Sequence, residues 1–397
     1  RPTDAPAGAS EGHGDMAARI VILGGGVGGT LAANLLAKQI PDSLATITVA
    51  DRTGKHVYQP GWLYLPFGRE QVKNLVRSER GLLDKRVNLV VDDFTRIDTE
   101  KRQIVAEGGT VLPWDYLIVA TGSRNFPEEV PGLAQGGHHF YSAEAALALG
   151  RELERFGGGR IVVGVGGIPH RCPPAPLEFL LLLDSDLRKR GTRERTELYY
   201  TYPIGRVFTI EPVAEFVQPI LDERGITYET FFNLETVDPV KKVATSMEGT
   251  ELDYDLLVMI PPHRGAEVIE ASGIGDEQGW VPTDRRLLAM KGQDDDPRIF
   301  AIGDATDLPV SKSGSAAHFQ AKGVAERIAA AVKDRPPENG LYHGRVMCFL
   351  ETGNDQATTL NFDYENPPEP PRPNRIYHYE KMVFNKTYWY IVPRGLV

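Results

Sequence analysis

The chain has 397 residues, of which 41% are apolar and 25% charged, a composition typical of globular proteins in water. This length is sufficient for two or three domains with their own hydrophobic cores. The 44 basic and 54 acidic residues give a net charge of −10, which argues against nucleic acid as the main partner. No apolar run approaches the roughly 20 residues that span a bilayer, and two cysteines are too few for a disulfide scaffold.

The chain begins with a segment of low apolar content. Residues 1–16 are rich in alanine, glycine and proline, and we expect them to form a disordered lead. They lack the charged, apolar and small-residue order of a secretory signal. Met16 is a candidate natural start, so this end of the chain does not determine the compartment.

The first predicted element is a dinucleotide-binding turn. Arg19–Leu23 is rich in β-branched residues, as in a parallel strand buried on both faces. Gly24, Gly26 and Gly29 follow in the spacing G-x-G-x-x-G, and Thr30–Lys38 has the pattern of a helix. A strand, this glycine spacing and a helix together form the kind of turn whose N–H groups hold a pyrophosphate.

An acidic residue completes the pattern. The next predicted strand, Ala45–Ala50, is followed directly by Asp51, 27 residues after Gly24. This is somewhat more than the usual spacing of about 20 for a ribose-binding carboxylate. A glycine-rich turn without a ligand is the alternative, but the four features together favour a dinucleotide site.

Two later stretches indicate which dinucleotide binds. The runs WDYLIVATG at 114–122 and RIFAIGD at 298–304 are both predicted strands that end in polar turns. The carboxylate of the second turn can meet the ribityl hydroxyls of a flavin, whereas a simple nicotinamide dehydrogenase needs neither stretch. The residues expected at the flavin are Thr121, Gly122, Gly303 and Asp304.

A second glycine turn departs from the dinucleotide pattern. The strand Arg160–Val163 is followed by glycines at 164, 166 and 167, but then by four prolines within residues 169–176. Prolines lack an N–H and disrupt a helix beyond its first turn. Cys172 stands where a phosphate would rest, so we interpret this turn as one that holds a thiol.

The glycine and polar turns, GGGVGG at 24–29, ATG at 120–122 and GDA at 303–305, together resemble the two-dinucleotide-binding-domain flavoproteins. The resemblance covers roughly 17–335 and implies an α/β fold of two Rossmann-like domains, the second inserted in the first, with FAD extended across the first. The expected parts are an FAD-binding domain (17–145 and 275–335), a second Rossmann-like domain (146–274) and a C-terminal domain with a membrane-interface segment (336–397).

The two stretches that contain cysteine indicate which flavoproteins of this superfamily the chain resembles. Cys172 in its proline-rich turn and Cys348 in CFLETG at 348–353 resemble sulfide:quinone oxidoreductases and the flavin subunit of flavocytochrome c sulfide dehydrogenase. The segments at 307–325 and 260–265 are also similar to that family. The resemblance implies that Cys348 lies beside the flavin and that Cys172 carries a growing sulfur chain.

The chemistry of sulfur agrees with this resemblance. Hydrosulfide can open a sulfur bridge between Cys172 and Cys348, leaving a persulfide and a thiolate. We expect a helix N-terminus and a nearby lysine to lower the thiol pKa. The segment 139–147 lacks the third cysteine of many relatives, and the chain has no thiol to tether a flavin, so a two-cysteine cycle and non-covalent FAD are expected. Two inert buried thiols are the alternative.

Other polar residues are candidate site residues with less support from the sequence. Glu178 follows the cysteine turn and can handle protons, although an acid at a helix start is favoured by the helix dipole alone. Lys312 can neutralise charge on the reduced flavin, and a solvated lysine is the alternative. His170 and His263 are candidates for proton transfer to a quinone. No metal-ligand spacing is found, and no metal is expected.

The end of the chain suggests where electrons go. Residues 367–373, PPEPPRP, predict a stiff spacer. Residues 376–392 then place aromatic side chains among Lys381 and Lys386, a composition that suits the bilayer interface. Packing of this segment on the body or on a partner subunit is the alternative from composition, while the resemblance favours membrane contact.

These patterns and the family resemblance together imply an FAD-dependent sulfide:quinone oxidoreductase, held peripherally (monotopic) on the cell membrane at an undetermined face. The expected partners are hydrosulfide and polysulfide, a membrane quinone and the membrane surface, and a homo-oligomer is left open. The alternatives are a flavocytochrome c-type flavin subunit, a type II NADH:quinone oxidoreductase and a non-enzymatic flavoprotein. The prolines and Cys172 in the second glycine turn argue against the NADH enzyme.

Overall fold

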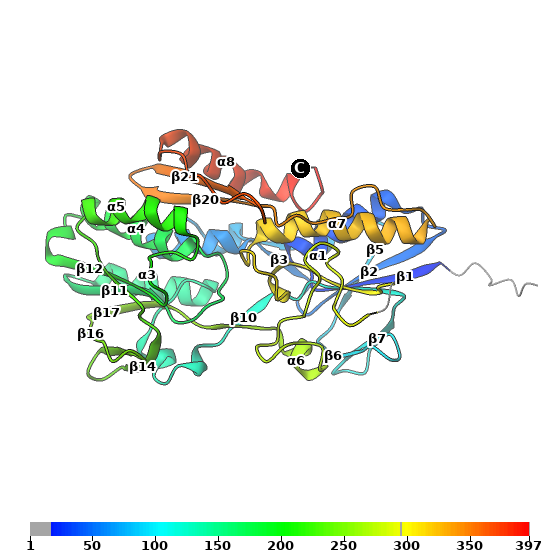
Figure 1. The fold of residues 1–397 in the computed structure, drawn as a ribbon, viewed down its shortest axis with the longest axis horizontal. Helices are drawn as coiled ribbons and strands as arrows, with labels where there is room; N and C mark the ends of the chain where they lie inside the picture. Colours follow the sequence, from blue (N-terminus) through cyan, green and yellow to red (C-terminus); the bar gives the residue numbers. More distant parts are fainter. Residues whose placement is uncertain (1–16, 294–295, 397) are drawn as a thin grey trace, which may run out of the picture.

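The structure is a computed structural model that describes residues 17–293 and 296–396. The lead predicted for residues 1–16 lies outside the described residues. Within them, two parallel sheets form two α/β units that lie side by side along the long axis, and a hairpin and a helix from the C-terminal segment lie along one side (Figure 1). The predicted fold class, two Rossmann-like units with the second inserted in the first, is confirmed.

The first sheet has five parallel strands in the order β19-β9-β1-β2-β5. Two helices cover one face, packing on Ile20 and Ile22, and a small antiparallel sheet covers the other, packing on Val21 and Leu23. Both faces of β1 are therefore apolar, as expected of a buried parallel strand. The elements are β1 Ala18–Leu23, β2 Ala45–Asp51, β5 Val87–Val91, β9 Tyr116–Val119, β19 Ile299–Ala301, α1 Val27–Gln39, α7 Gly314–Val332, and the covering sheet β6 Phe94–Asp98, β7 Gln103–Ala106 and β8 Val111–Pro113.

The second sheet repeats this plan with four parallel strands, in the order β13-β12-β11-β17. Helices pack on Ile161 and Val163 of its central strand, and a second antiparallel sheet packs on Val162. The elements are β11 Gly159–Val165, β12 Thr196–Tyr202, β13 Thr227–Thr230, β17 Leu256–Ile260, α3 Ala143–Arg155, α4 Ala175–Lys189, α5 Glu211–Glu223, and the covering sheet β14 Leu234–Asp238, β15 Val243–Ser246 and β16 Glu251–Asp253.

The chain crosses between the two units twice, and the two crossings pair with each other. β10 (Ser123–Asn125) leads out of the first unit and β18 (His263–Gly265) leads back, as an antiparallel pair. The second sheet is therefore inserted between β9 and β19 of the first. The exact bounds given above for the domains stay a prediction.

Shorter elements complete these two units. They are β3 Lys55–Val57, β4 Val76–Ser78, α2 Leu133–Gly136, α6 Glu267–Ala271 and the 3-10 turns η1 Gln59–Phe67, η2 Val72–Asn74, η3 Glu79–Gly81, η4 Pro127–Glu129, η5 Arg193–Arg195 and η6 Gly303–Ala305.

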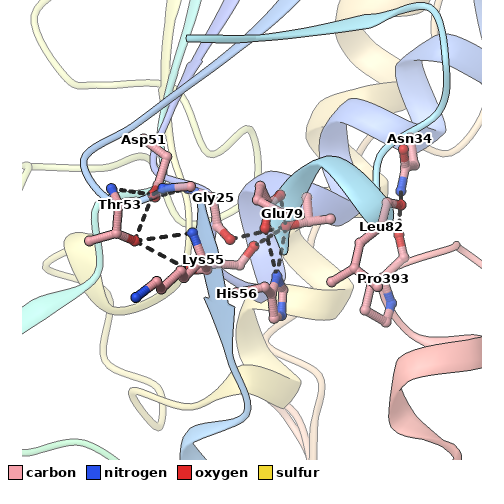
Figure 2. Close-up of polar contacts among 12 residues, drawn as sticks. Gly25, Asn34, Asp51, Thr53, Lys55, His56, Glu79, Leu82 and Pro393 are labelled. Carbon is pink, nitrogen blue, oxygen red and sulfur yellow. Dashed lines mark hydrogen bonds and ion pairs between the residues drawn. The ribbon is translucent and has the colours of Figure 1, made fainter. Parts of the chain in front are cut away.

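The C-terminal segment lies against both units. The hairpin β20 (Val346–Gly353) and β21 (Gln356–Phe362) packs on α4, and α8 (Arg375–Ile391) packs on the hairpin (Figure 1). The side chain of Asn374 caps α8 by accepting from the Tyr377 N–H at 3.1 Å. The residues after α8 rest on α1, where the Asn34 amide donates to the carbonyl of Pro393 at 2.6 Å (Figure 2).

Candidate active site

The glycine turn between β1 and α1 has the geometry of a dinucleotide cradle. Gly24 has φ +109°, and a Cβ there would collide with the carbonyl of Ala120; a Cβ on Gly29 would collide with the carbonyl of Gly24. These two glycines allow a tight turn and close packing of the helix on the strand. A Cβ on Gly26 would meet nothing within 4 Å, so this backbone borders open space, as required where a pyrophosphate approaches.

Asp51 lies at this turn, as its place after the second strand predicts. Its Oδ2 accepts from the Gly25 N–H at 2.9 Å, and its Oδ1 accepts from the backbone N–H groups of Thr53 and Gly54, both at 2.8 Å (Figure 2). These contacts hold the carboxylate beside the cradle, where a ribose would lie. The spacing of 27 residues is therefore compatible with the role that we propose for it.

A buried polar network behind the turn was missed by sequence reasoning. Thr30 Oγ1 donates to Glu79 at 2.7 Å, and His56 Nδ1 lies 3.2 Å from the same carboxylate (Figure 2). His56 Nε2 lies 2.7 Å from the hydroxyl of Tyr388 in α8. Both Glu79 and His56 are completely buried. Nothing in the sequence relates residues 30, 56, 79 and 388, because only the fold brings them together.

The two polar turns predicted to hold the flavin flank the same edge of the first sheet. Gly122 and Gly303 have φ of +69° and +68°, which glycine adopts at little cost. The buried Thr121 Oγ1 makes no hydrogen bond to the described residues, so it is free to bind a ligand. Burial raises the pKa of Asp304, while Arg171 and Lys312 act in the opposite direction. An open cradle and an unpaired hydroxyl fit an extended FAD.

Lys312 is buried rather than solvated. Its Nζ donates to the carbonyls of Thr306 at 2.6 Å and Asp304 at 3.2 Å, and lies 3.7 Å from the ring centroid of Trp280. Burial lowers its pKa to about 8. Its own carbonyl accepts from the Cys172 N–H at 2.6 Å, so Lys312 connects the proposed flavin loop with the thiol turn.

Cys172 occupies the turn before α4. Pro174 and Pro176 stand at the start of this helix, where prolines are tolerated, and the helix itself begins at Ala175. Cys172 has φ +46°, a left-handed conformation that is uncommon outside glycine. The Ala175 N–H donates to the Cys172 carbonyl at 2.9 Å, so the first turn of α4 lies against the cysteine.

Cys348, on β20, is brought to the same place. Both cysteines are half-buried free thiols packed against the same hydrophobic core. The Cys172 N–H donates to the Lys312 carbonyl, and the N–H of Met347, next to Cys348, donates to Ser315 Oγ at 2.9 Å, so both cysteines lie against the segment 312–315. The structure therefore brings together the two residues that were singled out from separate parts of the chain.

The expected lowering of the thiol pKa is wrong for these free thiols. Burial, together with the nearby Glu178 carboxylate, raises the pKa of Cys348 to about 12. The same two causes raise the pKa of Cys172. Lys381 and the Ala175 N–H act in the expected direction, but desolvation outweighs them.

Glu178 and Lys381 form a buried ion pair beside the thiols. Lys381 Nζ contacts Glu178 Oε1, which also accepts from the Glu351 N–H at 2.8 Å. Burial raises the pKa of Glu178. Burial alone would lower the pKa of Lys381, but Glu178, Tyr64 and Glu351 hold it well above its usual value. Lys381, expected at a bilayer interface, instead points into the protein from α8.

Arg171 is a second buried cation that the sequence did not single out. It donates to His263 Nε2 at 3.1 Å, Gln59 Oε1 at 3.0 Å and Asn125 Oδ1 at 2.7 Å. Because His263 Nε2 accepts this bond, its Nδ1 carries the proton and donates to a carbonyl at 2.9 Å. Burial and Arg171 hold the pKa of His263 well below its usual value, and burial lowers that of His170 to about 4. Both shifts favour the neutral imidazole, and the proton transfer considered for these histidines stays a prediction.

Comparison with known proteins decides the family. The model of the pyridine nucleotide-disulphide oxidoreductases matches residues 18–334. The chain belongs to this family. Its members bind FAD, which confirms the predicted cofactor and the predicted oxidoreductase class.

Two curated relatives are similar over most of the chain. The mitochondrial sulfide:quinone oxidoreductase of Mus musculus is 26% identical over 88% of this chain and 79% of its own length. The sulfide-quinone reductase of Aquifex aeolicus is 24% identical over 96% and 92%. The X-ray structure of the sulfide:quinone oxidoreductase from Aquifex aeolicus shares the fold, with a TM-score of 0.84 at 22% identity over 96% of this chain and 92% of that one. The resemblance inferred from the cysteine stretches is confirmed.

Proposed function

We propose that the protein is an FAD-dependent sulfide:quinone oxidoreductase. The observation that supports this proposal is that Cys172 and Cys348 pack on the same core and against the same segment, 312–315, near the Glu178–Lys381 ion pair, in a family of flavoproteins. The named relatives support the same substrate and acceptor.

The first step takes place on the two cysteines. Hydrosulfide attacks a sulfur bridge between Cys172 and Cys348: one S–S bond breaks, a new one forms, and a persulfide and a thiolate result. The positive charge of Lys381 stabilises the departing thiolate, since its electrostatic effect lowers the pKa of both thiols. A low pKa of the free thiols is not required, because the attacking sulfur comes from solution.

FAD, when bound, supplies the two-electron acceptor that passes the electron pair from sulfur to quinone. We propose that Gly24, Gly26, Gly29 and Asp51 hold its adenosine diphosphate part, and that Thr121, Gly122, Gly303, Asp304 and Lys312 hold its flavin part, without a covalent bond. The ammonium of Lys312 lies beside the Asp304 loop and offers positive charge there. Glu178 would accept the proton that hydrosulfide releases, since a raised pKa suits a general base.

The thiol turn disfavours a type II NADH:quinone oxidoreductase. In the first unit three residues separate the end of β1 at Leu23 from the start of α1 at Val27, whereas nine residues separate the end of β11 at Val165 from the start of α4 at Ala175. These residues include three of the four prolines and Cys172, and the cysteine N–H is already bound to the Lys312 carbonyl. The helix N-terminus that would hold a nicotinamide dinucleotide is therefore occupied by the thiol turn.

The outer face of α8 supports contact with a bilayer. Among the described residues, no helix is long and apolar enough to cross a membrane. However, α8 exposes an apolar stripe at 376, 379, 383 and 390, spaced three, four and seven residues apart so that its members share one side of the helix. Its members are Ile376, Tyr379, Val383 and Tyr390, exposed by 60–67%. The exposed Lys386 and Arg394 flank the stripe, and such a helix suits the surface of an anionic membrane.

Anaerobic flavin spectroscopy tests the enzymatic proposal. Sulfide should bleach the flavin absorbance of the purified holoprotein, and decyl-ubiquinone should restore it. Cys348→Ser should abolish bleaching by sulfide while FAD content stays unchanged. Bleaching by NADH but not by sulfide would overturn the proposal in favour of the NADH enzyme, and recovery with cytochrome c but not with quinone would favour the flavocytochrome c type.

Vesicle sedimentation tests the membrane proposal. The protein should sediment with vesicles that contain anionic lipid, and Val383→Asp should reduce the bound fraction on the order of 10-fold, because a charge must then enter the interface. Val240→Asp is the matched control, since Val240 is 90% exposed in the second unit. Equal binding by both variants would contradict docking through α8.

A further inference from the structure

A second buried carboxylate lies near the thiol site and has no part in the chemistry described so far. Glu351, on β20, is completely buried, three residues after Cys348. Burying a carboxylate costs several kcal/mol unless partners compensate it. Its partners are His378 Nδ1 at 3.0 Å from Oε2 and the Tyr64 hydroxyl, which donates to Oε1 at 3.1 Å. Because burial of this carboxylate is unfavourable, its two specific partners suggest that Glu351 has a function in the site.

Glu351 lies between the Glu178–Lys381 ion pair and the protein surface. On the inner side, its backbone N–H donates to Glu178, and its charge is among the causes that raise the pKa of Lys381. Tyr64 reaches both pairs, because its hydroxyl binds Glu351 while Lys381 Nζ lies 5.7 Å from its ring centroid. On the outer side, the side chain of His378 is 14% exposed.

The proposed reaction at the thiols releases a proton inside a buried site. Hydrosulfide loses its S–H proton when it becomes a persulfide anion, and Glu178 beside the thiols is buried to 3% exposure. When Glu178 takes this proton it loses its charge, so Lys381 loses its nearest counter-ion. Passing the proton on restores this ion pair, and the neighbouring carboxylate, Glu351, contacts an imidazole that reaches the surface.

We propose that Glu351 and His378 form the proton exit of the thiol site, carrying the proton of hydrosulfide from the Glu178–Lys381 pair to solvent beside α8. This rests on the function proposed above. In the transfer one S–H bond breaks and one O–H bond forms on Glu178, and the proton then passes to Glu351, to His378 and to water. No electrons move in these transfers, and the thiolate and persulfide are left for the redox step.

Stopped-flow flavin reduction by sulfide, anaerobic and without quinone, tests the exit. In dilute buffer, His378→Ala should slow reduction on the order of 100-fold, the lower end of what positioned proton transfer contributes. Imidazole at rising concentration should restore most of the rate, because a small base can take the place of the missing ring at the surface. Glu351→Gln should slow reduction by a similar factor without rescue, because the break lies inside the protein.

His343→Ala is the matched control, since His343 is an exposed histidine outside this cluster, and its rate should equal that of the unaltered protein with or without imidazole. FAD content and thermal midpoint establish that each variant is folded. If sulfide does not bleach the unaltered protein, the proposed function fails. If it does, and His378→Ala is either as fast as the unaltered protein or slow without rescue, the exit proposal is overturned.

Discussion

The reactivity of Cys348 toward an alkylating reagent is set by the charges around it. Burial and Glu178 raise the pKa of this thiol from 9.0 to about 12. At pH 8 a thiol of pKa 9 is about one-tenth thiolate, whereas one of pKa 12 is only about 10⁻⁴ thiolate. Because the thiolate is the reactive form, iodoacetamide should modify Cys348 about 10³-fold more slowly than a free cysteine.

Replacement of Glu178 by glutamine separates this electrostatic cause from simple shielding. The variant removes the negative charge beside the thiol and leaves Lys381 in place, so the thiol pKa should fall. A fall of one unit accelerates alkylation at pH 8 about 10-fold. The change is measured by mass spectrometry of the Cys348 peptide after timed exposure of the holoprotein to iodoacetamide.

A control and a pH series complete this assay. Glu380→Gln removes an exposed carboxylate from α8 and should leave the rate unchanged. The rate for the unaltered protein should rise about 10-fold per pH unit between pH 7 and 10, because the thiol stays mostly protonated throughout. A rate that is independent of pH, or a folded Glu178→Gln variant that reacts no faster than the unaltered protein, would refute the electrostatic explanation.

Three further predictions concern the cofactor and stability. Gly26→Val should leave folding intact but lower FAD affinity on the order of 100-fold, measured by fluorescence titration, because its side chain would fill the open cradle. His56→Leu leaves the buried Glu79 without its imidazole and should lower the free energy of unfolding in urea by about 3–5 kcal/mol. The raised pKa of Cys348 contributes to the stability of the folded protein, and this contribution is fully present below pH 9 and is lost as pH rises toward 12. For this thiol alone, the free energy of unfolding should therefore be about 1 kcal/mol lower at pH 10 than at pH 9. Cys348→Ser should reduce that loss.

The sequence predicted the parts of the fold and site that depend on local order. The strand, glycine turn and helix at 18–39 follow one another in the chain, so their spacing alone indicates a cradle. The helix predicted at Thr30–Lys38 begins three residues earlier, at Val27, because the last glycines of the turn adopt the helical conformation. The two cysteines were paired through motifs, and the fold places them together.

What the sequence did not predict depends on burial and on distant contacts. The thiol pKa was expected to fall under the influence of a helix N-terminus and a lysine. Both are near the thiols, but desolvation has the larger effect on the pKa, and no local sequence pattern reports desolvation. Lys312 was considered solvated as readily as functional, and its loop buries it. Glu79 and Arg171 have no neighbours in sequence that mark them, since their partners come from other elements.

The helix α8 shows how one segment can satisfy two interpretations that composition treated as alternatives. Packing on the body and contact with a membrane were weighed against each other for 376–392, yet a helix has two sides. One side exposes Ile376, Tyr379 and Val383, whereas the other brings His378 and Lys381 to the buried carboxylates beside the thiols. If both proposals hold, the proton leaves the thiol site next to the helix that meets the bilayer, where the quinone acceptor takes up protons as it is reduced.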